Sequence, residues 1–404
     1  MKRQRGRALG PVLAALALAG AVAWWLAAPA PPLAPEPPAR PAGALLVSTA
    51  QAALPASTPL PAAAGLSAAQ RLEQQAAWRQ RLERAQAALA NFQQAARYPN
   101  DSRPIDEQPD QIRPFAPIAE DRPLRAPGGS VAAGMRLRTT QERIFLAGPE
   151  SARVTVALVD EQGRTLPLRV TRAVLHEVTE PGRTARTNEV PVAVNDAGTA
   201  GDVQAGDGVY SALLQPAAQG FADFAGTVRL DLHLEHAGQP GFIFFDLVYS
   251  PEQAAVWLPG VRDAVVDGGL QFRLQAEVRI AGRYVVSARV DDAAGTPVAL
   301  ALFNAELGRG TQAVTLPVAG RLLHDKQPAF PLRLRDVEAF LLKPDAFPDR
   351  VMLPRLAGVV HSSALYALDR FSNAEPASEQ RDRYLAELSK DVREAQTQLQ
   401  QLGP

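Results

Sequence analysis

A charge-free stretch near the start of the chain constrains its architecture more than any other feature. It runs from Ala8 to Ala28, about 21 residues, and as a helix it would be about 31 Å long, which matches the hydrocarbon core of a bilayer. The basic residues before it are Lys2, Arg3, Arg5 and Arg7. Because basic residues stay on the cytoplasmic side, the sequence predicts a single-pass transmembrane anchor at 1–28 with the remaining chain exported.

The alternative for this segment is a signal peptide cleaved at Ala28-Pro29-Ala30. Pro31 and Pro32 directly follow that site and should hinder cleavage, and the apolar run is long for a signal peptide. We therefore expect an uncleaved signal-anchor, and either interpretation exports residues 30–404. The expected location is the bacterial inner membrane, with the bulk of the chain periplasmic or otherwise extracytoplasmic.

Two segments rich in proline follow the anchor region. Residues 29–66 are dominated by Ala and Pro, a composition that favours extended polyproline II conformation at about 3.1 Å per residue. We interpret this segment as a linker that holds the rest of the chain away from the bilayer. Residues 98–134 are polar and again contain several prolines, and we interpret them as an extended connector.

Heptad patterns predict a helix at 67–97 and another at 376–404. In the first, Ser67 with Gln70 forms a capping-box pattern; in the second, Ser378 can cap the start. The first seam consists of Trp78, Leu82, Ala85, Leu89, Phe92 and Ala96, and the second of Leu385, Leu388, Val392, Ala395, Leu399 and Leu402. Such seams are typical of coiled coils. The two helices could pair antiparallel within one chain, join like helices in a homodimer, or each lie on a β-domain.

Between these helices the hydrophobic pattern has a period of two. Leu230, Leu232 and Leu234 alternate with polar residues, and the same alternation recurs in short stretches separated by Gly, Asp and Pro turns. This spacing indicates antiparallel β-sandwiches. The predicted fold class is mainly β, with one sandwich at 135–255 and another at 256–375.

A Gly-x-Tyr sequence enters a strand in each module, at 208–210 and at 282–284, as in the tyrosine corner of immunoglobulin-like folds. With the surrounding Asn195-Asp196-Ala197-Gly198 loop and the 310–316 run, residues 135–345 resemble the Ig-like modules of bacterial surface and envelope proteins called choice-of-anchor X domains. The resemblance implies two Ig-like domains on an envelope protein, without catalytic activity.

The loop before the first Gly-x-Tyr holds three candidate metal ligands. Asp196, Asp202 and Asp207 lie among several glycines, and Ca²⁺ prefers oxygen ligands on flexible loops. The alternative, which we favour, is that these residues only supply turn conformations, because a bidentate Glu at a defined spacing is missing. No other cofactor is expected.

The sequence gives little support for catalysis. Asp231, His233 and Glu235 share one face of a predicted strand, which is more typical of a solvated sheet surface than of a metal site or an acid/base site. His176 lacks the second His of a zinc protease motif, and nucleotide-binding and nucleophile-elbow motifs are absent. A hydrolase with a triad assembled from distant loops is the remaining enzymatic alternative.

Composition narrows the partners. Lys plus Arg and Asp plus Glu are both 42, so a nucleic-acid partner is not expected. Cysteine is absent, which excludes disulfides and Cys-ligated metals. The expected function is a non-catalytic, membrane-anchored envelope protein that presents its modules to a protein partner. The alternative is a calcium- or carbohydrate-binding surface module, although Trp257 is the only tryptophan in the β-region.

Overall fold

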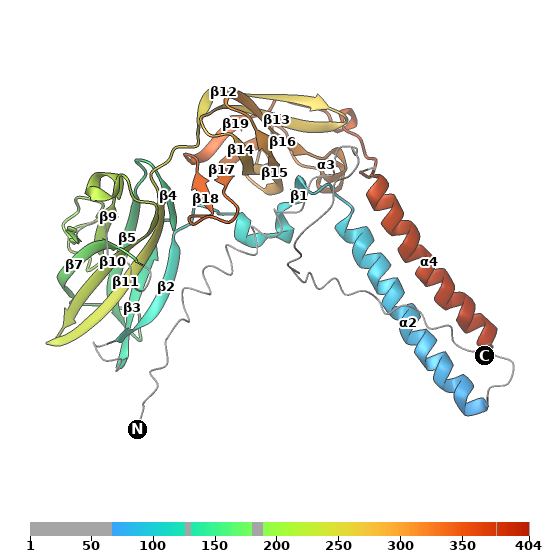
Figure 1. Cartoon of the computed structure of the whole chain (residues 1–404), viewed down its shortest axis with the longest axis horizontal. Coiled ribbons are helices and arrows are strands. Elements are labelled where there is room, and N and C mark those ends of the chain that lie inside the picture. Colours follow the sequence, from blue (N-terminus) through green and yellow to red (C-terminus); the bar gives the residue numbers. More distant parts are fainter. Residues whose placement is uncertain (1–66, 126–130, 180–188, 377, 404) are drawn as a thin grey trace, which may run out of the picture. The chain divides into compact units, whose positions relative to one another are not determined.

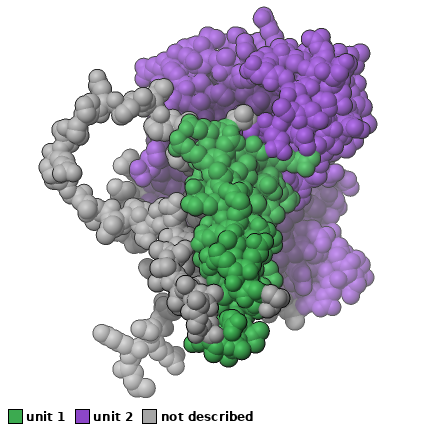
Figure 2. All heavy atoms as spheres, turned by 90° about the vertical axis from the view of Figure 1, so that its right-hand side faces the viewer, with its two compact units in different colours: residues 1–97, 377–404 green, residues 98–376 purple. Residues whose placement is uncertain are grey.

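The computed structural model describes residues 67–125, 131–179, 189–376 and 378–403. The chain forms two compact units, one made of residues 1–97 and 377–404 and the other of residues 98–376 (Figure 2). The predicted anchor at 1–28 and the linker at 29–66 lie outside the described residues. None of the helices in the described ranges is long and apolar enough to cross a membrane.

The first unit contains two long helices, α2 (Ala68–Ala95) and α4 (Glu379–Leu402), shown in blue and red in Figure 1. The predicted capping box is confirmed: the Ser67 hydroxyl accepts from the Gln70 amide at 3.2 Å, and the Gln70 side chain accepts from the Ser67 amide at 2.9 Å. Ser378 caps α4 by accepting from the Arg381 amide. Local sequence signals therefore place both helix starts correctly.

Helices α2 and α4 pack against each other antiparallel. Near the start of α2, Gln75 donates to the backbone oxygen of Gly403 at 2.7 Å, and near its end the ring of Phe92 lies 5.7 Å from that of Tyr384. Trp78 and Ala395 are buried, and the other residues of both seams are half-buried. The seams thus face each other within one chain, which is one of the three arrangements that the heptads allow.

The first β module has two sheets that enclose one core. Its first sheet contains β2 (Ile118–Arg125), β3 (Val131–Gln141), β5 (Ala152–Asp160), β6 (Thr165–Leu166) and β9 (Tyr210–Leu214). Its second sheet has the order β4 (Phe145–Ala147), β11 (Gln239–Ser250), β10 (Gly226–His236), β7 (Arg169–Glu177) and β8 (Val190–Pro191). All pairings are antiparallel except that of β4 with β11. Buried residues such as Val156 and Leu232 come from both sheets.

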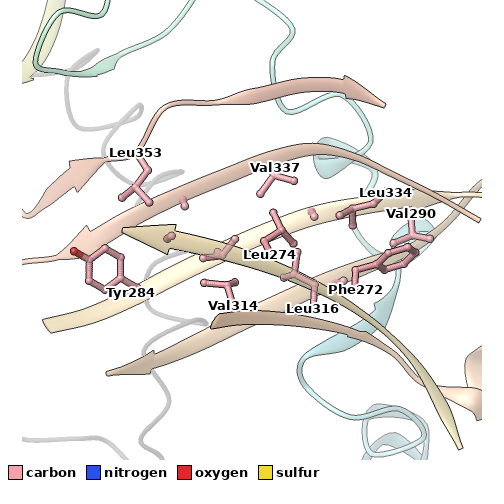
Figure 3. Packing of buried hydrophobic residues seen from close by; sticks show 14 of the residues in the cluster. Phe272, Leu274, Tyr284, Val290, Val314, Leu316, Leu334, Val337 and Leu353 are labelled. Atoms are coloured by element: carbon pink, nitrogen blue, oxygen red, sulfur yellow. The ribbon is translucent and has the colours of Figure 1, made fainter. Parts of the chain in front are cut away.

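The second β module also has two facing sheets. One is the three-stranded sheet β12 (Ala255–Val266), β13 (Gly269–Val278) and β16 (Gly310–Val318). The other has the order β1 (Ser102–Pro104), β15 (Pro297–Leu307), β14 (Gly282–Asp291), β17 (Arg333–Leu342) and β18 (Arg350–Met352). Strand β19 (Leu356–Ser362) also pairs with β17. Figure 3 shows Phe272 and Leu316 from the first sheet meeting Leu334 and Val337 from the second. The prediction of a mainly β chain is confirmed.

The prediction of an extended connector at 98–134 is wrong. Strand β1 pairs with β15 at the edge of the second module, and Ile105 beside it is only 1% exposed. Strand β2 pairs with β3 and contributes Leu124 to the core of the first module. The first module thus begins at Ile118, not at 135, and the second module includes a segment that precedes the first in the sequence.

A buried arginine fixes that early segment. Arg289 on β14 is 0% exposed and donates to the Gln111 backbone oxygen at 2.8 Å, to the Gln111 side chain at 2.5 Å and to the Asp336 backbone oxygen at 3.1 Å. Burial lowers the pKa of Arg289 to about 10, while Glu338 and Asp336 favour its charged form. The guanidinium therefore remains charged at neutral pH and holds residues around Gln111 against the sheet.

Contacts also join the two β modules. Ala147 of β4 belongs to the buried core of the second module. The guanidinium of Arg350 lies over the rings of Phe145 and Phe340, at 4.7 and 4.9 Å from their centroids. Such contacts between a guanidinium and two aromatic faces stabilise the junction by about 0.5–2 kcal/mol each.

Candidate functional site

The aspartate-rich loop lies between β8 and β9. The carboxylate of Asp196 accepts hydrogen bonds from three of its backbone amides. Its Oδ1 accepts from the amides of Gly206 at 2.7 Å and Asp207 at 3.2 Å, and its Oδ2 accepts from the amide of Gly208 at 2.9 Å. Both glycines have positive φ, of 76° and 78°, which turns their amides toward the carboxylate. Asp196 therefore organises the loop through backbone hydrogen bonds.

The other two predicted metal ligands have separate partners. Asp202 accepts from the Gly198 amide at 2.6 Å and from the Ser211 hydroxyl at 3.0 Å, and these hydrogen bonds lower the pKa of Asp202. Asp207 accepts from the Val209 amide at 2.9 Å. Both line a small hollow of about 170 Å³ that also includes Glu142 and Arg153. Among the described residues, no three His, Cys, Asp or Glu side chains converge as a metal site would require.

This geometry predicts that Asp196→Ala lowers the free energy of unfolding by about 1–3 kcal/mol. The amides of Asp207 and Gly208 lose their carboxylate acceptor, and the Gly206 amide keeps only the backbone oxygen of residue 196, at 3.2 Å. Chemical denaturation measures the loss, and hydrogen exchange should show faster exchange at Gly206 and Gly208. The exposed Glu161, which no described residue contacts through a hydrogen bond, provides the control variant Glu161→Ala. A calcium-dependent rise in melting temperature that Asp196→Ala abolishes would contradict the purely structural role.

The polar row on β10 lies on one face, as the period of two predicts. Leu230, Leu232 and Leu234 are buried between Asp231, His233 and Glu235, which are half-buried. On the neighbouring strand β7, Nε2 of His176 lies 3.2 Å from Oδ2 of Asp231. Arg169, also on β7, donates to the Glu235 carboxylate at 2.5 Å. His233 packs on the ring of Phe242. These are cross-strand pairs that stabilise a sheet surface.

A second cluster of polar groups is centred on Asp263 of β12, and no sequence pattern predicts it. Its Oδ1 lies 2.7 Å from Nε2 of His361 on β19, and its Oδ2 accepts from the Tyr366 hydroxyl at 2.8 Å and the Ala364 amide at 3.0 Å. Burial alone would raise the pKa of Asp263, but the hydrogen bonds outweigh burial and lower the pKa. The partners lie about a hundred positions away in the sequence, so no local motif marks the cluster.

The lowered pKa of Asp263 has a defined consequence for stability. A carboxyl group with a lower pKa in the folded state stabilises the fold above its unfolded pKa, near 4, and loses that effect as the pH falls through the folded pKa. Asp263→Asn should therefore lower the free energy of unfolding by about 1–3 kcal/mol at pH 7, with a smaller loss at pH 2–3.

Urea denaturation of wild type and variant at both pH values tests this prediction. Asp267→Asn, in the exposed turn after β12, is the matched control, because Asn also accepts its positive φ of 49°. If Asp263→Asn lowers the free energy of unfolding by the same amount at pH 7 and at pH 2–3, the charge of the Asp263 carboxylate does not stabilise the fold.

No protein-family model and no curated protein matches the chain. Structural similarity to solved proteins is distant. A DUF4785 family protein from Legionella pneumophila has a TM-score of 0.38 at 12% identity, over 56% of this chain and 57% of its own. The trypsin-activated alpha-2-macroglobulin of Escherichia coli has a TM-score of 0.21 at 12% identity, over 57% of this chain and 15% of its own. The Escherichia coli adhesin FdeC has a TM-score of 0.19 at 15% identity, over 54% of this chain and 64% of its own. Similarity at this level leaves the family and the function of the chain open.

Proposed function

We propose that the chain is a non-catalytic, membrane-anchored protein of the bacterial cell envelope that presents two Ig-like β modules to a protein partner. The proposal is supported by the hydrogen bonds that the candidate aspartates make. Asp196, Asp202 and Asp263 bind loop amides and neighbouring side chains within the fold. These contacts give each of the three carboxylates a structural role, which favours a display module over an enzyme.

The Ig-like assignment has support in the second module. The hydroxyl of Tyr284, at the start of β14, donates to the backbone oxygen of Ile280 at 2.6 Å, four residues upstream. This is the arrangement of a tyrosine corner. In the first module the hydroxyl of Tyr210 instead donates to Leu168 on a distant segment. The two modules therefore use their Gly-x-Tyr sequences differently, and the corner supports the assignment in the second module alone.

Membrane attachment rests on the charge-free run of 8–28 and its basic flank. The full-length chain, expressed in a bacterial host, should remain in the membrane pellet after alkaline extraction. A variant lacking residues 8–28 should move to the soluble fraction. Mass spectrometry of the purified full-length protein gives the mature N-terminus. Release of the full-length chain by alkali, or a mature N-terminus near Ala30, would contradict the anchor.

The partner can be tested with the chain in its membrane. A photo-crosslinking residue is placed at Val203 or Val359, two apolar side chains that are 78% and 58% exposed in the first and second modules. The proposal predicts a defined crosslinked species with another envelope protein from at least one position. Diffuse or absent crosslinking at both positions and at further exposed sites would count against a protein partner.

A further inference from the structure

The outer face of the three-stranded sheet in the second module is hollowed where β12 bulges. Leu258 pairs with Gln275 and Arg262 pairs with Arg273, so β12 has three intervening residues where β13 has one. Pro259 and Gly260, the latter with φ 90°, form part of this bulge. The bulge borders a groove of about 460 Å³ that continues along β13. This volume falls in the range of small-molecule sites, about 300–1,000 Å³.

Two arginines lie side by side in the groove. Arg262 and Arg273 are direct cross-strand partners and both are exposed, whereas the alternate residues of β13, Phe272 and Leu274, are buried. Side chains opposite each other on antiparallel strands have Cβ atoms about 4.5–5.5 Å apart, and like charges there are destabilising. Among the described residues, no hydrogen bond or ion pair compensates either guanidinium.

The nearest acidic side chain in the lining does not neutralise the pair. Asp263 follows Arg262 and points to the other face, where His361, Tyr366 and the Ala364 amide occupy its oxygens. Its side chain is only 10% exposed. The charged groups that line the groove are thus the two guanidiniums and this internally bound carboxylate, which leaves two positive charges facing the groove.

Two amide side chains flank the arginines. Gln271 and Gln275 lie two positions on either side of Arg273, on the same face of β13, and both line the groove. Each amide offers two N–H donors and one acceptor oxygen, which suits hydroxyl groups on a ligand. The lining has no aromatic ring on which a neutral sugar could stack.

We propose that this groove binds a sugar phosphate, with the phosphate dianion between Arg262 and Arg273 and sugar hydroxyls on Gln271 and Gln275. Guanidinium groups bind phosphate oxygens in bidentate pairs, and two of them match the charge of a phosphate monoester. The groove is much larger than a phosphate ion, so we expect the phosphate to be part of a larger polar molecule. The inference goes beyond the proposed display function and does not depend on where the chain is located.

Isothermal titration calorimetry of the purified full-length protein in detergent, at about 50 mM salt, tests the proposal with glucose 6-phosphate as the probe. A polar ligand of this size should bind with a Kd of about 0.3 mM. Arg262→Gln and Arg273→Gln should each weaken binding about 10-fold or more, because each removes a charge-assisted pair. Gln271→Ala should have a smaller effect, about 3-fold.

Arg136→Gln is the matched control, since Arg136 is an exposed arginine on a strand of the first module with no ion-pair partner among the described residues. It should bind as wild type does. Circular dichroism melts check that the groove variants remain folded. The proposal is overturned if glucose 6-phosphate fails to bind, if inorganic phosphate or poly-glutamate binds at least as tightly, or if Arg262→Gln and Arg273→Gln bind like the control. Failure of the membrane-extraction experiment would leave these outcomes unchanged, so the two proposals fail separately.

Discussion

Replacing Arg289 with alanine should lower the free energy of unfolding by about 3–5 kcal/mol. The guanidinium is fully buried and donates to backbone oxygens of Gln111 and Asp336 and to the Gln111 side chain. The substitution leaves these acceptors buried without a donor and opens a cavity beneath the segment that contains Gln111. Urea denaturation followed by circular dichroism measures the loss.

The exposed Arg309 in the turn after β15 provides the control. Arg309→Ala removes the same charge from the same module and should change stability by less than about 0.5 kcal/mol. Hydrogen exchange adds a local readout, because residues 105–112 should exchange faster in Arg289→Ala. If both variants have the same small effect, the early segment is not held by Arg289.

Gly320→Ala should cost about 3 kcal/mol or more. Gly320 begins helix α3 (Gly320–Lys326), where a Cβ would meet the backbone oxygen of Gly268 and lie 2.5 Å from the oxygen and 2.8 Å from the nitrogen of Ser372. Those two residues are themselves joined by a backbone hydrogen bond of 2.8 Å. Because all the obstructing atoms belong to the backbone, no side chain can rotate away to make room.

Gly308→Ala is the matched control, because its Cβ would meet only the side-chain nitrogen of Gln312 at an ordinary 3.7 Å. This variant should be neutral within about 0.5 kcal/mol. Thermal melts of the two variants give the comparison. Equal melting temperatures for Gly320→Ala and wild type would mean that α3 does not approach the β12–β13 turn as closely as described.

The helices were predictable because their signals are local. The capping box at Ser67 and Gln70 lies within four residues, and the seam that starts at Trp78 repeats every three or four residues. Period-two alternation on β10 likewise predicts which residues are buried, since each strand presents alternate side chains to the core. What these signals leave open is the choice of partner, because the same seam fits a helix of the same chain or of another copy.

The sequence mispredicts the early segment because its prolines and polar residues are also typical of an extended connector. Pro104 is the last residue of the short edge strand β1, a position that proline tolerates because an edge strand has a free side. Only the burial of Ile105 and the contact with Arg289 reveal that the segment is part of the second module. Both depend on contacts almost two hundred residues apart in the sequence.

The candidate sites also depend on contacts that local sequence patterns do not predict. The three aspartates of the 195–208 loop could be identified from sequence, but their individual hydrogen bonds depend on how the glycines turn the backbone. The Asp263 cluster and the arginine pair on β12 and β13 need the register between strands, because a shift of one residue would move Arg262 to the other face. Single-sequence patterns do not provide that register.

We propose that an N-terminal anchor leaves both β modules outside the cytoplasm, and the absence of cysteine permits a direct test. Gln4→Cys marks the basic tip, and Val203→Cys marks a side chain of the first module that is 78% exposed. Spheroplasts are treated with a membrane-impermeant maleimide before and after lysis. If the modules lie outside the cytoplasm, Val203→Cys is labelled in intact spheroplasts and Gln4→Cys is labelled only after lysis. Protection of Val203→Cys until lysis would place the modules in the cytoplasm and contradict the proposed topology.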